Sequence, residues 1–310
     1  MKQIVVGSRD SRLALAQTRQ VIAQLEKIAP RYSYLVKTIK TKGDIILDTA
    51  LAKIGDKGLF VKEIENALLR GEIDMAVHSM KDVPTALPPG LKIGAVVLRD
   101  DPRDAVVGDF SLASLPAGSV IGTGSLRRVA LLCRAYPRLS FKPVRGNLDT
   151  RLRKLEERTC SALILAYAGL RRLGLQELVS EILSPQLCLP AAGQGALAVE
   201  CRAGDETVEE LLALLDHQAT RAAVSAERSF VRRLEGGCQV PLGTLGEVKG
   251  KTLHLQGVIA SLDGSQVVRG EERGNPAEAE ILGIRLAERL LAQGGAAILE
   301  KVRHDFDARE

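Results

Sequence analysis

The strongest constraint in this sequence is a repeated alternation of short apolar runs with amphipathic segments over its first two thirds. The apolar runs have the length of buried strands, and the segments between them space their apolar residues as helices do. Strands are expected at 4–7, 34–40, 73–78, 93–98, 120–122, 139–144, 162–166 and 195–201. Helices are expected at 11–28, 60–70, 126–135, 148–157 and 208–215. This alternation predicts the α/β class, with mixed or mostly parallel sheets and helices on both faces.

The last third of the chain follows a different pattern. A long helix is expected at 221–234 and a final helix at 276–291. Between them, strands are expected at 244–248, 252–261 and 266–271. Because strands and helices are grouped here instead of alternating, we expect an α+β module. A length of 310 residues fits two or three domains, and the polar stretch 99–104 indicates a first boundary.

Composition argues against several classes of protein. Apolar residues make up 45% and charged residues 26% of the chain, which is usual for a globular protein and unlike a disordered or collagenous one. The longest apolar run, 161–170, is shorter than the roughly 18 residues of a membrane-spanning helix. Aromatic residues reach only 3% and Trp is absent, so a base-stacking platform for single-stranded nucleic acid is not expected.

The cysteines indicate a reducing compartment. The chain has 5, and none forms a CxxC pair, so neither a disulfide framework nor a zinc site is expected. The N-terminal residues also lack the features of a signal or transit peptide. These observations predict a cytoplasmic protein without a metal site.

Positive charge is concentrated in one part of the chain. The formal net charge is +5, but residues 121–172 contain ten Arg, two Lys and three acidic residues, which leaves a net charge of −4 for all the others. Arginine binds carboxylates and phosphates through two parallel N–H groups. The basic zone therefore indicates an anionic small molecule or a nucleic acid. For any single arginine, a solvated helix face is an equally good interpretation.

Three basic turns follow three of the expected strands, at 122–128, 144–151 and 168–172. Ser125 and Asn147 are placed to cap the helices that follow the first two turns. Helix N-termini bind anions, and ligands of α/β sheets collect at the carboxyl ends of the strands. We therefore expect the three turns to form one anion site, with ordinary exposed turns as the alternative.

Two further segments carry reactive side chains. At 77–84 an apolar strand runs into His78, Lys81 and Asp82, and a carboxylate at that position can stabilise a developing cation or move protons. A capping role for Asp82 and a structural role for His78 are the alternatives. At 236–243 Cys238 lies among glycines after a basic helix, where cations favour the thiolate. A buried inert cysteine is the alternative there, as it is for the other four cysteines.

Together these segments resemble the porphobilinogen deaminase family, also called the hydroxymethylbilane synthases. Residues 227–243 resemble the family's cofactor-attachment signature, and 78–84 its catalytic-aspartate loop. Further matches follow in family order at 7–9, 58–60, 126–128, 145–147 and 193–196. The resemblance covers nearly the whole chain. One departure is Gly124, where the family usually has Ser.

The resemblance implies two periplasmic-binding-protein-like α/β domains followed by an α+β domain. The first domain would comprise residues 1–98 plus 196–216, and the second 99–195. The third, 217–310, would carry Cys238. The stretch 44–57 is open to two interpretations, a cover for the cleft or a plain surface loop.

The resemblance also implies a transferase of tetrapyrrole and haem biosynthesis. It would join four porphobilinogen molecules head to tail, with loss of ammonia, on a dipyrromethane cofactor bound to Cys238 by a thioether, and release hydroxymethylbilane. The implied catalytic residue is Asp82. The implied cofactor-binding residues are Cys238, Lys81, Asp82, Thr123, Ser125, Arg127, Arg128, Arg145 and Gly146. The implied substrate-binding residues are Arg9, Ser11, Phe60, Arg145, Arg151, Arg172 and Gln194. Lys81 is open to two roles, holding Asp82 ionised or binding a propionate.

The expected partner is porphobilinogen alone, without nucleic acid or membrane. A monomer is expected, with handover of the product to uroporphyrinogen-III synthase. Two other classes stay open. A binding protein for an acidic ligand would share the architecture but need no thiol at 238. A nucleic-acid binder would show strongly salt-dependent affinity and keep it after Asp82→Ala.

Overall fold

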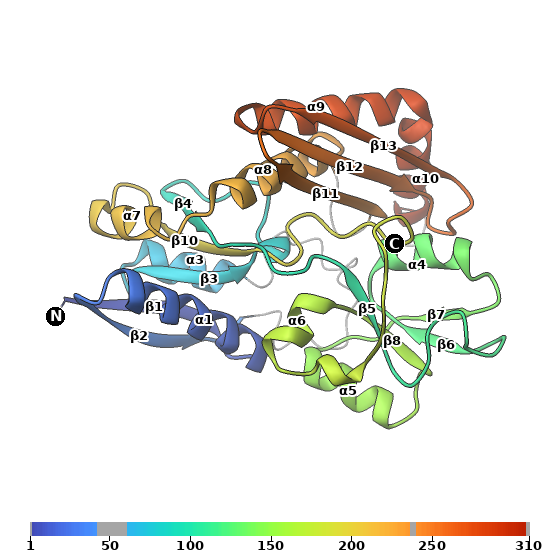
Figure 1. The fold of residues 1–310 in the computed structure, drawn as a ribbon, viewed down its shortest axis with the longest axis horizontal. Coiled ribbons are helices and arrows are strands. Elements are labelled where there is room, and N and C mark those ends of the chain that lie inside the picture. The colour runs from blue at the N-terminus through green and yellow to red at the C-terminus, as the bar shows by residue number, and fades with distance from the viewer. Residues whose placement is uncertain (1, 42–60, 236–239, 308–310) are drawn as a thin grey trace. The chain divides into compact units, whose positions relative to one another are not determined.

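The computed structural model describes residues 2–41, 61–235 and 240–307, which form two compact units (Figure 1). Unit 1 contains the described residues up to Asp100 together with Gly195–Arg221. Unit 2 contains Asp101–Gln194 and the described residues from Ala222 onward. The chain thus leaves unit 1 and returns to it before ending in unit 2. The expected division into three domains remains a prediction. Among the described residues, no helix is both long enough and apolar enough to cross a membrane.

Unit 1 is built on a mixed five-stranded sheet with the order β2-β1-β3-β10-β4. Its strands are β1 (Lys2–Arg9), β2 (Tyr32–Ile39), β3 (Met75–Ser79), β4 (Leu91–Val96) and β10 (Leu197–Arg202). β1 runs parallel to β2 and β3, whereas β10 runs antiparallel to β3 and β4. The sheet is mixed because β10, which enters after the excursion through unit 2, lies between β3 and β4 in the opposite direction.

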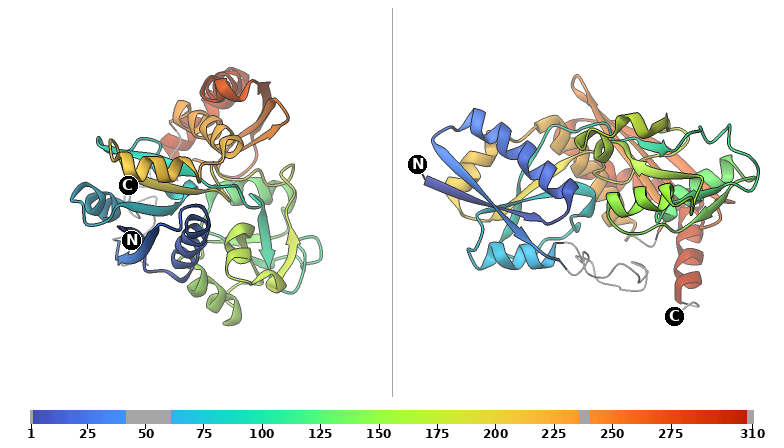
Figure 2. Two further views of the ribbon diagram at one scale, coloured as in Figure 1. Left: turned by 60° about the vertical axis from the view of Figure 1, so that its left-hand side comes forward. Right: turned by 90° about the horizontal axis from the view of Figure 1, so that it is seen from below.

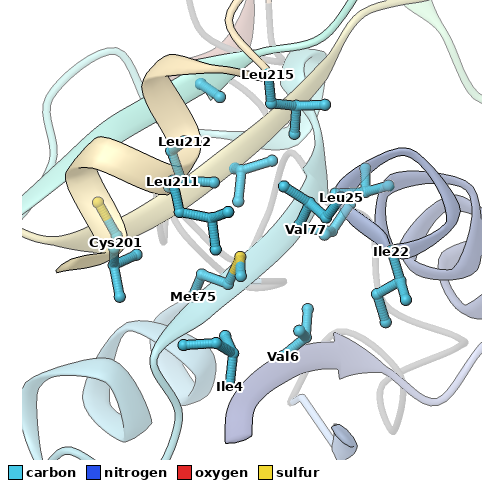
Figure 3. Close-up of a cluster of buried hydrophobic side chains, with 14 of the residues drawn as sticks. Ile4, Val6, Ile22, Leu25, Met75, Val77, Cys201, Leu211, Leu212 and Leu215 are labelled. Atoms are coloured by element: carbon cyan, nitrogen blue, oxygen red, sulfur yellow. The ribbon is translucent and has the colours of Figure 1, made fainter. Parts of the chain in front are cut away.

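Helices cover both faces of this sheet, as Figure 2 shows. They are α1 (Arg12–Ile28), α3 (Lys62–Leu69) and α7 (Glu206–Ala213). On one face, α1 and α7 pack their apolar side chains onto Met75 and Val77 of β3 (Figure 3). On the other face, Ile64 and Leu68 of α3 pack onto Ala76. Alternate residues of β3 therefore point to different cores, as the period of a strand requires.

The first part of unit 2 is a second mixed sheet, with the order β7-β6-β8-β5-β9. Its strands are β5 (Asp104–Val107), β6 (Val120–Gly122), β7 (Ser140–Lys142), β8 (Ala162–Ala166) and β9 (Val179–Ile182). β6 is parallel to β7 and β8, and β5 is antiparallel to β8 and β9. The helices are α4 (Leu126–Ala135), α5 (Leu148–Glu156) and α6 (Tyr167–Arg172), with the short η3 (Gln176–Leu178) before β9.

The C-terminal part of unit 2 is an antiparallel sheet with helices on one face. The strands are β11 (Leu242–Lys249), β12 (Thr252–Ala260) and β13 (Val267–Gly274). The helical segments are α8 (Gln218–Arg233), η4 (Pro276–Glu278), α9 (Ala279–Leu290), η5 (Leu291–Gly295) and α10 (Ala296–Asp307). Phe230 of α8 and Leu286 of α9 pack onto Leu255 of β12. The other face of β12 adds Val258 and Ala260 to the core that α4 shares with the preceding sheet.

The α/β class and the C-terminal α+β arrangement are confirmed, and β6, α4 and β8 have the bounds expected from the sequence. Four elements were not expected: β5, α6, β9 and α10. The division between the two units falls at Asp100 and Asp101, within the polar stretch 99–104, although Asp104 is already the buried first residue of β5. The helix expected at 276–291 is present as η4 and α9, which ends at Leu290. The helical path then continues through η5, where Gly294 at a φ of 106° makes a kink, into α10.

Candidate functional site

In unit 1, the carboxyl ends of β1 and β3 open into a pocket of about 60 Å³. β1 ends at Arg9, β3 ends at Ser79, and both strands run in the same direction. The pocket is lined by Arg9, Ser11, Leu13, Ala14, Gln17, Val61, Val77, His78, Ser79 and Asp82. Three residues expected at the site from the sequence, Arg9, Ser11 and Asp82, thus share one pocket wall. This is the edge of the sheet where ligands of α/β proteins collect.

The turn that carries Asp82 is held by its apolar neighbours. β3 continues into the single turn η2 (Met80–Asp82). Met80 and Val83 are buried, and the Met80 N–H donates to the carbonyl oxygen of Ala196 at 3.0 Å. Because these two side chains point inward, Lys81 and Asp82 between them are exposed. The alternation of apolar and charged residues in the loop therefore presents a carboxylate at the pocket mouth.

The N-terminus of α1 also lines the pocket. The Ser11 hydroxyl accepts the Ala14 N–H at 3.2 Å and caps the helix. Gln17, one turn further on, is buried, and its Nε2 donates to the Ser79 hydroxyl at 2.8 Å. Sequence reasoning missed Gln17, although an amide at a core-facing position of an amphipathic helix is an available signal. It ties α1 to the end of β3.

Three titratable side chains, Glu65, His78 and Glu200, form a buried group that we call the His–Glu cluster. Nε2 of His78 lies 3.1 Å from Oε2 of Glu200, and both side chains are at most 3% exposed. His78 and Glu200 point to the face of the sheet that α3 covers, where Glu65 is also buried. Burial raises the pKa of Glu65, and the charge of Glu200 raises it further. His78 also lines the pocket, so the cluster reaches the wall that carries Asp82.

In unit 2, the three basic turns follow the parallel strands β6, β7 and β8, so they lie at one edge of the sheet. The expected caps are confirmed. The Ser125 hydroxyl accepts the Arg128 N–H at 3.4 Å, and Oδ1 of Asn147 accepts the Thr150 N–H at 2.9 Å. The Thr123 hydroxyl accepts the N–H of Ser125 at 3.3 Å. Both expected hydroxyl groups are thus already used in shaping the first turn.

Arg127 and Arg128 point into unit 2 and bind Asp104, a group that we call the Asp–Arg cluster. Nη1 of Arg127 lies 2.8 Å from Oδ2 of Asp104, and Nη2 of Arg128 lies 2.7 Å from Oδ1. Remaining donors reach backbone, from Arg127 to the Leu189 oxygen at 2.7 Å and from Arg128 to the Ile164 oxygen at 2.8 Å. Burial alone would raise the pKa of Asp104, but the two guanidinium groups outweigh it and hold that pKa well below its ordinary value.

The sequence placed these two arginines at the rim of an anion site, and the structure corrects that placement. They are only 4% and 5% exposed. The reason is Asp104, which is buried and would lack a counter-ion without them. Each keeps one Nε–H without a hydrogen-bond partner in the described part of the chain. Ligand binding by Arg127 and Arg128 therefore stays a prediction, and neutralising Asp104 is the task that the structure assigns to them.

Gln194 joins the Asp–Arg cluster at the point where the chain leaves unit 2. Its Nε2 donates to Oδ1 of Asp104 at 2.8 Å and to the Pro102 oxygen at 2.7 Å. One residue further along, the Gly195 oxygen accepts the Asp100 N–H at 3.2 Å within unit 1. The two stretches of chain that connect the units are thus hydrogen-bonded to each other on both sides of the boundary. The substrate contact expected for Gln194 stays a prediction.

The cations nearest to solvent at this edge of unit 2 lie on the second and third turns. Arg145 is half-buried, and in the described residues no carboxylate lies within ion-pair distance of its guanidinium. Nε of Arg151 donates to the Gly146 oxygen at 2.9 Å. Gly146 has a φ of +107°, and a Cβ there would also meet Thr150, so only glycine suits the turn. Arg172, at the end of α6, is half-buried.

Among the described thiols, those of Cys188 and Cys201 are fully buried. Burial raises the pKa of Cys188 to about 12, with Asp104 adding to the effect. Burial likewise raises the pKa of Cys201 to about 11. Both groups are therefore protonated near neutral pH and poor nucleophiles.

Cys238, Phe60 and the stretch 44–57 lie outside the described residues. The helix before Cys238 is anchored by Glu227, which is fully buried. Its Oε2 accepts the Gly193 N–H at 2.6 Å and its Oε1 accepts the Gly246 N–H at 2.7 Å. Glu227 therefore joins α8 both to the loop before Gln194 and to β11.

The comparisons with known proteins agree along the whole chain. Residues 4–210 match the family described as "Porphobilinogen deaminase, dipyromethane cofactor binding domain", and 221–292 match "Porphobilinogen deaminase, C-terminal domain". The chain is 56% identical over 306 residues to a porphobilinogen deaminase of Carboxydothermus hydrogenoformans, with 98% of each chain covered. It is 51% identical to that of Synechococcus elongatus, over 97% of this chain and 96% of the relative. A solved structure of the methionine-binding protein MetQ aligns with 69% of this chain and 88% of its own, at a TM-score of 0.42 and 13% identity.

Proposed function

Because the chain belongs to the porphobilinogen deaminase family, we propose that Asp82 is its catalytic carboxylate and that Cys238 carries its dipyrromethane cofactor. The enzyme is a transferase of tetrapyrrole biosynthesis that joins porphobilinogen molecules head to tail, with loss of ammonia, into hydroxymethylbilane. The observation that carries the proposal for Asp82 is its position in the wall of the unit 1 pocket, together with Arg9 and Ser11.

Asp82 suits the charge that the reaction develops. When ammonia leaves porphobilinogen, positive charge forms on the methylene carbon and its pyrrole ring. A carboxylate held at the pocket mouth stabilises that charge and can accept the proton that the attacking ring loses. Lys81 precedes it on the same turn and is proposed to bind a propionate or to keep Asp82 ionised.

Arginines are proposed to hold the carboxylates of substrate and cofactor. Each porphobilinogen carries an acetate and a propionate, and a guanidinium binds a carboxylate through two hydrogen bonds. The residues present fit such a group, since Arg145 is a half-buried cation without a carboxylate partner among the described residues. When bound, the dipyrromethane supplies the pyrrole carbon to which the first porphobilinogen is joined. The proposed contacts are Arg9, Ser11, Arg145, Gly146, Arg151, Arg172 and, beyond the described residues, Phe60.

The first turn of unit 2 is proposed to act mainly through its shape. Thr123 and Ser125 form the cap of α4, and the remaining N–H groups of that helix end can meet a carboxylate. The guanidinium groups of Arg127 and Arg128 are buried beneath this turn, where they bind Asp104. They are proposed to add positive electrostatic potential at the turn. Gln194 is proposed to position the chain between the units.

We also propose a cytoplasmic monomer of three domains that passes its product to uroporphyrinogen-III synthase. Four described cysteines are free thiols, which suits a reducing compartment. The core of the C-terminal sheet is built from residues between Ala223 and Val302, which supports a separate third domain. Light scattering of the purified protein tests the monomer.

The deciding experiment is the intact mass of the purified protein and of two variants. We expect a mass excess of two pyrrole units on the wild type and on Cys133→Ser, and none on Cys238→Ser. Cys133 is the matched control because its thiol is partly exposed and lies in α4. An adduct on Cys238→Ser, or none on wild type incubated with porphobilinogen, would overturn the proposed attachment.

A further inference from the structure

The His–Glu cluster has more carboxylates than counter-ions. Glu65 and Glu200 are 7% and 0% exposed, and the imidazole of His78 lies within ion-pair distance of Glu200. Oε1 of Glu65 and both carboxylate oxygens of Glu200 lack an aligned hydrogen-bond donor in the described part of the chain. A buried carboxylate without such donors is costly to ionise. The cluster therefore places three side chains that can bind and release protons in one buried group.

The cluster also reaches the pocket that Asp82 lines. His78 is 4% exposed and contributes to the wall of the same pocket as Asp82. Three residues of β3 and η2 lie between His78 and Asp82, and one of them, the buried Met80, fixes the turn. The charged or titratable groups around the imidazole are Glu200 from β10, Glu65 and Lys62 from α3, Arg9 from β1 and Asp82 from its own loop.

The reaction moves one proton in every elongation step. The C–N bond of the protonated aminomethyl group breaks, and its electron pair leaves with nitrogen as ammonia. A C–C bond forms from the electrons of the attacking ring, whose C–H proton must then depart. Ammonia takes up one proton as ammonium, so the proton count balances if the enzyme holds the ring proton in between.

We propose that His78, backed by Glu200 and Glu65, is a positioning residue that receives this proton from Asp82 and returns it for release with ammonia. Glu200 stabilises the imidazolium while the proton is stored. In this proposal Glu65 stays protonated and uncharged, so that Glu200 is the one negative charge beside the imidazolium. This inference rests on the role of Asp82 proposed above.

The first test compares pH–rate profiles of the holoenzyme and its His78→Gln and Glu200→Gln variants. We expect kcat to fall at least about tenfold in His78→Gln, within the range for proton-transfer groups, while KM for porphobilinogen changes less than about twofold. In Glu200→Gln the acid limb of kcat should move to lower pH, because the imidazolium has lost its counter-ion. His217→Gln, in the same unit, is the control and should leave the profile in place.

The second test needs no turnover. Imidazole ¹⁵N spectra of the four histidines are recorded against pH, with His78→Gln assigning the His78 signal. His78 should pass from neutral ring to imidazolium while the protein stays folded, and Glu200→Gln should move that midpoint to lower pH. A His78 ring that keeps one protonation state throughout, or a His78→Gln variant with the wild-type kcat and profile, would overturn the inference.

The outcomes separate this inference from the function beneath it. If Asp82→Ala abolishes turnover while His78→Gln behaves as wild type, the proton store is refuted and the role of Asp82 stands. If Asp82→Ala keeps wild-type turnover, the proposed site itself fails. Should His78→Gln not fold, the Glu200→Gln profile and spectra decide alone.

Discussion

The two units each place a buried ionic cluster behind the carboxyl ends of their strands, and the clusters differ in how completely their charges are paired. In unit 2, Asp104 has two guanidinium groups, and both of its oxygens accept charge-assisted hydrogen bonds. In unit 1, only one of two buried carboxylates, that of Glu200, lies within ion-pair distance of an imidazole in the described residues, and three of the carboxylate oxygens lack aligned donors. The two clusters are similarly buried. The Asp–Arg cluster is a fully paired structural ion pair, whereas the His–Glu cluster keeps groups that can bind or release a proton.

The same contrast holds at the surface of the two edges. Unit 1 presents the exposed carboxylate of Asp82, whereas unit 2 presents cations such as Arg145. An anionic substrate with a developing positive charge needs both kinds of group, because cations hold its carboxylates and an anion stabilises its reacting carbon.

Removing the exposed carboxylate should have the largest effect. Asp82→Ala is expected to lower turnover at least about a hundredfold, since it removes the group that stabilises charge and accepts a proton. The free energy of unfolding should stay within about 0.5 kcal/mol of wild type, because the side chain is exposed. Formation of hydroxymethylbilane is the measurement, with the exposed Asp109→Ala as control. Near wild-type activity would remove Asp82 from the mechanism.

Breaking the paired cluster should cost most in stability. Asp104→Ala leaves two buried guanidinium groups without a counter-ion, and we expect a loss of about 3–5 kcal/mol in urea unfolding. Asp101→Ala, which breaks a partly exposed pair with Arg103, should cost about 1 kcal/mol or less. Because the pKa of Asp104 is lowered in the folded protein, its contribution is present at neutral pH and lost as the pH falls below 3.8. Equal losses of unfolding free energy in Asp104→Ala and Asp101→Ala would contradict a special role for the buried Asp–Arg cluster.

A surface cation of unit 2 should affect binding more than stability. Arg145→Ala is expected to raise KM for porphobilinogen roughly tenfold, the value of one hydrogen-bonded charge contact. Arg153→Ala is the matched control, because Arg153 lies on the neighbouring helix α5, is 67% exposed and pairs only weakly with Glu157. If both variants raise KM alike, the effect is general electrostatics and not a specific contact.

The smallest effect on stability should come from removing the charge of Glu65 in the His–Glu cluster. Burial, and after it the charge of Glu200, raises the pKa of Glu65 above its ordinary 4.5, so the folded protein binds more protons than the unfolded chain. The contribution of Glu65 to the free energy of unfolding is therefore largest below pH 4.5. It decreases as the pH rises through the raised pKa. Glu65→Gln should flatten that slope and gain about 1 kcal/mol or less at neutral pH. Thermal melts from pH 4 to 8 measure it; an unchanged slope would argue against a strained carboxylate.

Local features of this molecule could be predicted from its sequence, whereas long-range pairing could not. The caps at Ser125 and Asn147 follow from side-chain chemistry within four residues, and both are present. Arg127 and Arg128 were expected to face a ligand because their counter-ion lies 23 and 24 residues away, in a strand that was not expected from the sequence. Gln194 meets the same carboxylate across 90 residues. His78 was interpreted as structural because nothing near it in the sequence points to Glu200.

The position of β10 also determines the order in which the sheets can form on the ribosome. Every strand of the α/β sheet of unit 2 lies between Asp104 and Ile182, so that sheet is fully synthesised first. The sheet of unit 1 waits for residues 197–202 to fill the place between β3 and β4. Until then β3 and β4 each lack a hydrogen-bonding neighbour and expose a strand edge, the kind of surface that recruits other chains. The N-terminal half of this enzyme is therefore the half that most needs protection during translation.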